Sequence, residues 1–134
     1  MSPSGRGRTA NDPPTRIDSI SAVTLATQDM ARAVQFYRGL GFVISHGGES
    51  EPFTSFHAGA GYLNLIAQGA ERPWSWWGRV IFYVSDVDAL YRAALAQGLE
   101  PSFPPRDASW GERYFHITGP DGHELSFAKP ASTL

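Results

Sequence analysis

The sequence contains no cysteine, no long apolar segment and little net charge, and each absence excludes a class of protein. Without cysteine the chain cannot form disulfides, thiolate nucleophiles or zinc–thiolate sites. The formal net charge of −2 provides no basic field for nucleic acid. Residues 1–16 carry Arg6 and Arg8 among polar and proline residues but no apolar core, so they predict a flexible leader instead of a signal peptide or membrane anchor. We therefore expect a cytoplasmic protein with no membrane and no nucleic-acid partner.

What is present is one structural unit used twice. The segment 79–99 repeats the segment 22–42 with one constant offset, which is 57 residues when Asp86 is placed on Asp29 (86 − 29). In both copies an alternating apolar pattern, typical of a half-buried strand, changes to the spacing of an amphipathic helix. The repeat therefore predicts a strand, a turn and a helix at the start of each half of the chain.

The ends of the two predicted helices are duplicated as well. Asp29 and Asp86 suit N-caps, and Gly41 and Gly98 suit the left-handed position that follows a helix. After each helix come short alternating segments separated by Gly/Pro turns, so each half reads as βαβββ. We predict an α+β fold in which two tandem βαβββ modules form a curved mixed sheet with an open cleft. The predicted divisions are a leader at 1–16, one domain at 17–130 (module one 17–68, linker 69–78, module two 79–130) and a tail at 131–134.

Strand alternation divides the strand residues between two faces. The apolar face, expected beneath the helices, carries Val23, Leu25, Leu63, Leu65, Val80, Phe82, Leu125 and Phe127. The opposite face mixes polar and aromatic side chains, which suits a ligand cleft. Its members are Ala22, Thr24, Tyr62, Asn64, Arg79, Ile81, Tyr83, Glu124 and Ser126, joined by Tyr114 and His116 if Phe115 and Ile117 enter the core.

Three local segments add to the paired modules. They are 29–37 before Leu40-Gly41-Phe42, the helix start Asp86-Val87-Asp88, and the turn 119–123 before the last strand. Together these features resemble the vicinal oxygen chelate superfamily, which includes glyoxalase I, extradiol dioxygenases, fosfomycin-resistance enzymes and bleomycin-binding proteins. The resemblance covers about residues 17–130 and implies the fold more strongly than any one reaction, because one fold hosts many chemistries. It also implies a homodimer, since members of this size commonly pair.

The resemblance implies where a metal would be bound. In metal-dependent members the ligands, usually His, Glu or Gln, sit at the start of each module's first strand and within each module's last strand. These positions fall on Ala22, Asn64, Arg79 and Ser126, and none is a usual ligand of a catalytic divalent metal. Ala22 has no donor atom, and Arg79 brings a permanent positive charge. We therefore predict no metal and no other cofactor.

An enzyme remains the alternative prediction. His116 and Glu124 are the weak catalytic candidates because they are expected on the same face, with His123 in the adjoining turn. They could hold a divalent metal at a relocated site, although Arg79 would repel it, or His116 could act as a general acid or base. The chain would then be a lyase, isomerase or dioxygenase of the same superfamily. Ordinary hydrogen bonds are the simpler explanation of these residues.

The preferred prediction is metal-independent binding or sequestration of a small anionic or aromatic molecule in the cleft, without turnover. Arg79 could hold a carboxylate or phosphate through its guanidinium fork, or it could pair with Glu124. Trp74 and Trp76 in the linker offer further stacking surface. A third possibility is a regulatory domain with a vestigial cleft that binds a partner protein. The predicted ligand-binding residues are Arg79, His116, Asn64, Tyr62, Tyr83, Trp77, Trp110 and Ser126.

Overall fold

The structure is a computed structural model that describes residues 19–69 and 77–131. The predicted leader, Trp74 and Trp76 lie outside the described residues. Module one contains β1 (Ala22–Thr27), α1 (Met30–Gly39), β2 (Ile44–His46), β3 (Phe53–Ala58) and β4 (Gly61–Ala67). Module two contains β5 (Arg79–Tyr83), α2 (Val87–Ala96), β6 (Arg106–Asp107), β7 (Glu112–Thr118) and β8 (Glu124–Pro130). The predicted duplication of a βαβββ unit is confirmed.

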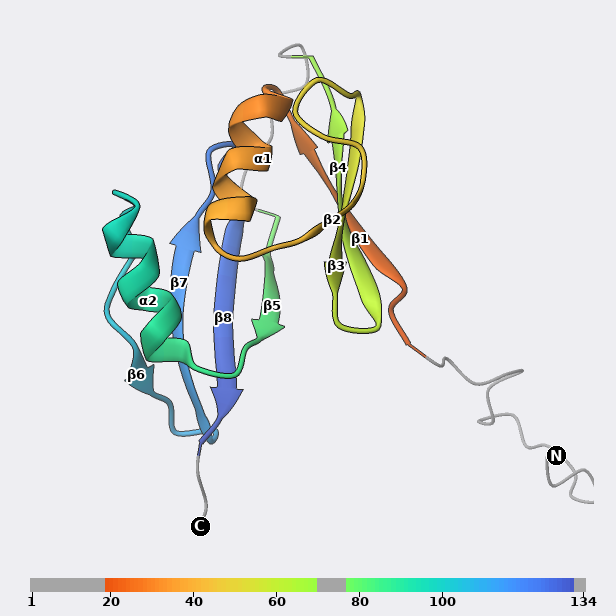
Figure 1. Ribbon diagram of the computed structural model, residues 1–134. Helices are drawn as coiled ribbons and strands as arrows, with labels where there is room; N and C mark the ends of the chain where they lie inside the picture. The colour runs from red at the N-terminus through yellow and green to blue at the C-terminus, as the bar shows by residue number, and fades with distance from the viewer. Residues whose placement is uncertain (1–18, 70–76, 132–134) are drawn as a thin grey trace, which may run out of the picture.

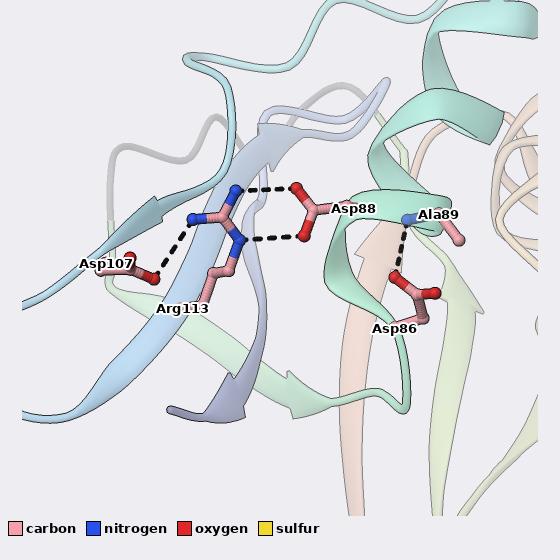
Figure 2. Close-up of polar contacts among 5 residues, drawn as sticks. All are labelled: Asp86, Asp88, Ala89, Asp107 and Arg113. Atoms are coloured by element: carbon pink, nitrogen blue, oxygen red, sulfur yellow. Dashed lines mark hydrogen bonds and ion pairs between the residues drawn. The ribbon is translucent and has the colours of Figure 1, made fainter. Parts of the chain in front are cut away.

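Both helices begin and end as the sequence predicted. The carboxylates of Asp29 and Asp86 each accept a hydrogen bond from the backbone N–H three residues later, at 3.1 and 3.0 Å, and the second is drawn in Figure 2. Gly41 and Gly98 follow the helices with φ of +98° and +80°, a left-handed backbone conformation that is unfavourable for residues with a side chain. Neither helix in the described part of the chain is long and apolar enough to cross a membrane.

Each module forms its own four-stranded mixed sheet. Sheet one has the order β1-β4-β3-β2, and sheet two has the order β5-β8-β7-β6. In each sheet the first and last strands of the module run parallel, because the helix between them returns the chain to the same end, and the other pairs are antiparallel. Figure 1 shows the two sheets side by side, with α1 lying along their upper part and α2 beside sheet two.

One core joins the two modules. The Phe42 ring, just after α1, packs edge-on against Phe82 of β5, with ring centres 5.1 Å apart. The Gln97 side chain at the end of α2 donates a 2.7 Å hydrogen bond to the Gly39 carbonyl at the end of α1. The core contains Leu25, Leu63, Leu65, Phe115, Ile117, Leu125 and Phe127, with Val23, Val80 and Phe82 packed against it. The predicted apolar face is therefore confirmed, and the outer face of each sheet lies on the side away from this shared core.

Arg113 fastens α2 to sheet two from the inner side. Its Nη2 and Nε donate to the two carboxylate oxygens of Asp88 at 2.8 and 2.9 Å, and Nη1 donates to Asp107 at 3.2 Å (Figure 2). The hydrogen bonds from Arg113 lower the pKa of Asp88 below its usual range. The guanidinium thus connects α2, β6 and β7, and it sets the position of the short strand β6.

Candidate functional site

The strand register places the outer-face residues of sheet two in rows. The row across β5, β8, β7 and β6 is Tyr83, Ala128, Tyr114 and Arg106, and the next row is Ile81, Ser126 and His116. Arg79 stands opposite Glu124 in a third row. Four of the predicted ligand residues, Arg79, Tyr83, His116 and Ser126, therefore share this face, as strand alternation predicted.

The charged centre of this face is Glu124. Its Oε2 lies 2.5 Å from Arg79 Nε and 3.2 Å from His116 Nδ1. Arg79 is 38% exposed at its side chain, whereas Glu124 and His116 are 21% and 17% exposed, so the carboxylate and imidazole sit deeper than the guanidinium. Arg79 is thus paired with Glu124, which was one of its two predicted roles.

The surroundings of His116 favour its neutral form. Partial burial lowers the pKa of the imidazole, and the nearby positive charges of Arg79 and Arg106 lower it further, while Glu124 opposes them. A neutral imidazole next to a carboxylate can accept or relay a proton. The arrangement therefore has the elements of an acid–base pair, although Arg79 neutralises much of the carboxylate's charge.

Aromatic rings continue this face along β7. Trp110, Tyr114, His116 and Phe103 follow one another with ring centres 5.1 to 5.5 Å apart. Tyr114 is buried, whereas Trp110 is 66% exposed and presents a flat apolar surface to solvent. Neighbouring rings are inclined to one another by 36° to 81°, so they form a chain of tilted and edge contacts, and Trp110 offers the exposed flat face at its end.

Tyr83 crosses the middle of the face. Its phenol donates a hydrogen bond to Glu112 of β7, and the Trp110 indole N–H donates to the same carboxylate at 3.1 Å. The Glu112 hydrogen bond raises the pKa of Tyr83. Because β8 lies between β5 and β7, the tyrosine side chain passes over Ala128, which is fully buried. We call the group Tyr83, Glu112 and Trp110 the polar bridge.

Two predicted ligand residues lie on sheet one. Tyr62 and Asn64 are on the outer face of sheet one, where Asn64 Nδ2 donates to Thr24 Oγ1 at 3.3 Å and the Tyr62 ring is near His57. These two residues belong to sheet one, whereas Arg79, Tyr83, His116 and Ser126 belong to sheet two. Within one chain, the residues that the sequence predicted in one cleft are therefore divided between the two sheets.

Trp77 and His123 have a structural role at the junction of the modules. The Trp77 indole donates to His123 Nδ1 at 2.8 Å, and His123 Nε2 lies 2.8 Å from the Ala26 carbonyl. Because an indole N–H can only donate, Nδ1 must accept, and Nε2 carries the proton that is donated to Ala26. His123 is 5% exposed. Both its nitrogens are engaged between β1 and β8, so it is not available as the metal ligand considered above.

The residues at the family's metal positions do not fit a metal. Ala22 and Asn64 belong to sheet one, whereas Arg79 and Ser126 belong to sheet two. The positive charge of Arg79 forms an ion pair with Glu124. Across residues 19–69 and 77–131 no three His, Asp or Glu side chains gather closely enough to hold an ion. A relocated metal at His116 and Glu124 would therefore have two protein ligands and an adjacent guanidinium.

Sequence reasoning missed three residues of this face. Glu112 is one of them, although its position two residues before Tyr114 gives it the alternation of the outer face of β7. Phe103 and Arg106 lie in a proline-rich segment without periodicity, and their position depends on the pairing of β6 with β7. The sequence alone contained no signal for these two.

Comparison with known proteins agrees with the fold. The model of the Glyoxalase/Bleomycin resistance protein/Dioxygenase superfamily matches residues 17–127, whereas no protein of curated function matches significantly. A glyoxalase/bleomycin resistance protein/dioxygenase from Nocardioides is 24% identical, with a TM-score of 0.69, over 90% of this chain and 88% of its own. TioX from Micromonospora sp. ML1 is 27% identical, with a TM-score of 0.66, over 84% and 99%. A bleomycin-binding protein complexed with bleomycin is 22% identical, with a TM-score of 0.67, over 84% and 98%. Because the family model covers most of the chain, this protein belongs to the Glyoxalase/Bleomycin resistance protein/Dioxygenase superfamily.

Proposed function

We propose that this chain is a cytoplasmic, metal-independent binding protein that holds a small planar anionic or aromatic molecule on the outer face of sheet two. The observation that carries the proposal is the exposed Trp110 ring, which is held at the end of a chain of ring contacts through Tyr114, His116 and Phe103. Flat ligands stack on such surfaces, with roughly 0.5–1.5 kcal/mol per ring pair beyond the area that is buried. Arginines at the margin of the same face supply positive charge for an anionic group.

Two further observations support binding without a metal. The residues at the family's metal positions lack suitable donor atoms, and Arg79 places a fixed positive charge at one of them. One solved structure of similar fold is a bleomycin-binding protein with bleomycin bound, which is an example of this fold used for a small organic ligand. Because the similarity to that protein is one of fold, we infer the ligand class of this chain from its own residues.

We extend the proposal to a homodimer in which a second copy covers this face. Apolar side chains are exposed on both outer faces: Ile81 at 56% and Tyr83 at 62% on sheet two, and Tyr62 at 43% and Ile66 at 38% on sheet one. The edge strands β1 and β5 also end their sheets with one side not covered by another strand. A second copy that lays sheet one against sheet two would bury both patches and return Tyr62 and Asn64 to a common cleft.

Light scattering at tens of micromolar tests the dimer. We expect twice the mass of the chain, and Ile81→Lys should give a monomer because it places a charge within the buried patch. Leu95→Lys is the matched control, since Leu95 is 48% exposed but lies on α2. A monomeric wild-type protein would contradict the dimer proposal and leave the binding proposal to its own test.

Ligand binding is tested on protein dialysed against a chelator. A thermal-shift screen of aromatic acids, phosphates and planar antibiotics should identify ligands, and calorimetry should then give saturable binding with no metal added. Trp110→Ala should weaken binding about 5- to 10-fold, the loss of one stacking contact, whereas Leu95→Ala should not change it. Binding that appears only after zinc, nickel, iron or manganese is restored would refute the metal-independent role.

The second candidate function is acid–base catalysis by the same residues. It is favoured by the 3.2 Å approach of His116 Nδ1 to Glu124 and by the lowered pKa of that imidazole, which leaves a neutral base at neutral pH. Incubation of an identified ligand with the protein, followed by NMR of the ligand, separates the two functions. Recovery of unchanged ligand supports binding, and conversion that is lost in His116→Gln supports catalysis.

A further inference from the structure

The two arginines on the outer face of sheet two differ in what surrounds their charge. Arg79 donates to the Glu124 carboxylate at 2.5 Å, which leaves little net charge at that position. Arg106 instead donates from Nε to the Tyr114 hydroxyl at 3.1 Å, and its Cζ lies 3.7 Å from the centre of the Phe103 ring. In the part of the chain that the structure describes, these two partners of Arg106 are both neutral. Arg106 therefore keeps its charge while its orientation is fixed.

The contacts of Arg106 leave its binding edge available. The stacked Phe103 ring covers one face of the guanidinium plane, and the Tyr114 hydroxyl takes Nε. The two terminal nitrogens are not used by these contacts, and they form the edge that matches a planar carboxylate with two parallel hydrogen bonds. Arg106 itself is exposed, whereas Tyr114 is 9% exposed and firmly held. The cation is therefore oriented before any ligand arrives, which reduces the entropic cost of binding.

We propose that Arg106 is the principal anion contact of the ligand site and that the ligand is an aromatic carboxylate with two or more fused rings. This inference rests on the proposed binding function and adds the position and the chemistry of the contact. The row from Arg106 through Tyr114 and Ala128 to Tyr83 spans three interstrand spacings, about 14 Å. Because Ala128 is fully buried beneath Tyr83, a carboxylate on Arg106 places the fused aromatic body toward the other neighbour of Tyr114, Trp110, whose ring is 66% exposed and lies 5.5 Å from the Tyr114 ring.

The other charges on the face favour one negative charge over two. Glu112 belongs to the polar bridge, where its carboxylate accepts hydrogen bonds from the neutral phenol of Tyr83 and the neutral indole of Trp110. These donors do not cancel its negative charge, which therefore acts on a ligand at this face. Among the described residues of this face the other guanidinium, that of Arg79, is already paired with Glu124, so a phosphate dianion at the same position would meet the Glu112 carboxylate with one cation to offset it. A monoanionic carboxylate needs one guanidinium, which Arg106 supplies.

The test is calorimetry with 2-naphthoate and its neutral analogue 2-naphthamide on full-length protein. Arg106→Gln should weaken 2-naphthoate binding at least 10-fold, as expected for the loss of a charge-assisted pair, and should leave 2-naphthamide binding unchanged. Arg106→Lys keeps the charge but loses the fork and the stack, so it should fall between wild type and Arg106→Gln. Arg38→Gln removes an exposed charge from α1 and should have no effect. Thermal unfolding of each variant checks that it is folded.

The outcomes distinguish this inference from the function on which it rests. If Arg79→Gln weakens 2-naphthoate binding as much as or more than Arg106→Gln, the assignment of the anion contact to Arg106 is overturned and the binding function stands. If 2-naphthamide loses as much affinity as 2-naphthoate in Arg106→Gln, the charge has no special role and the inference is likewise overturned. If the wild-type protein binds neither compound nor any other aromatic acid, both proposals fail.

Discussion

His123 joins the two modules, and its removal should be costly. The side chain is 5% exposed and makes two 2.8 Å hydrogen bonds, one from the Trp77 indole and one to the Ala26 carbonyl. Each hydrogen bond contributes about 0.5–1.5 kcal/mol, and His123→Ala also leaves an unfilled space. We expect the free energy of unfolding to fall by about 2–4 kcal/mol. At roughly 4 °C per kcal/mol for a domain of this size, Tm should fall by about 8–16 °C.

The assay is urea unfolding followed by tryptophan fluorescence, with an unchanged m-value as the sign that two-state behaviour is kept. His57→Ala is the matched control, because His57 is exposed on the outer face of sheet one. His123→Gln can still donate to Ala26 and should recover about half of the loss. A loss in His123→Ala within about 0.5 kcal/mol of that in His57→Ala would refute the structural role given to this histidine.

Three further predictions follow from the same contacts. Arg113→Met should lower Tm and make the protein less sensitive to acid. The lowered pKa of Asp88 stabilises the wild-type fold above pH 3.8, the ordinary pKa, and this stability is lost as pH falls through the folded-state pKa. In urea titrations across this range, the variant should therefore lose less free energy of unfolding than the wild type. Burial and two arginines lower the pKa of His116 below 6.5, so just below that pH the unfolded state binds more protons than the folded state. The free energy of unfolding should therefore rise with pH in that window. A His116→Gln protein whose free energy of unfolding has the same slope against pH would contradict this. Tyr83→Phe removes a hydrogen-bond donor from Glu112 but keeps the ring, which leaves the carboxylate charge less compensated, so 2-naphthoate should bind roughly 2- to 10-fold more weakly in calorimetry; tighter binding would show that the polar bridge blocks the site.

The repeat made the fold predictable from the sequence. Asp29 and Asp86 act through the backbone next to them, and Gly41 and Gly98 through their own φ, so local chemistry fixed both helices. Alternation likewise placed Phe115 and the other inward residues of long strands, because a strand has one choice between two faces. The short edge strands were harder. β2 has three residues and an irregular register with β3, and β6 has two residues that are held by pairing with β7 and by Arg113.

The candidate site was predictable in part for the same reason. His116, Glu124 and Arg79 share a face because alternation and register are local rules. The position of Arg106 depends on a loop whose path is set by tertiary contacts, and sequence spacing carries no information about it. Nor could alternation show that Tyr62 lies on a different surface from His116, since this depends on how the two modules pack around one core.

The central claim is that this protein binds a flat anionic ligand on the outer face of sheet two without a metal. Its most direct test is a ¹H–¹⁵N NMR titration of chelator-treated protein with 2-naphthoate. We predict saturable shifts in the outer-face residues of β5, β6, β7 and β8, and in Tyr62 and Asn64 where the second copy lies against them, with the Trp110 indole and the Arg106 side chain among those that move most. Shifts centred instead on the groove between α1 and the segment that follows α2, lined by Arg32, Phe36 and Leu99, would contradict the claim. So would shifts that appear only after a divalent metal is added.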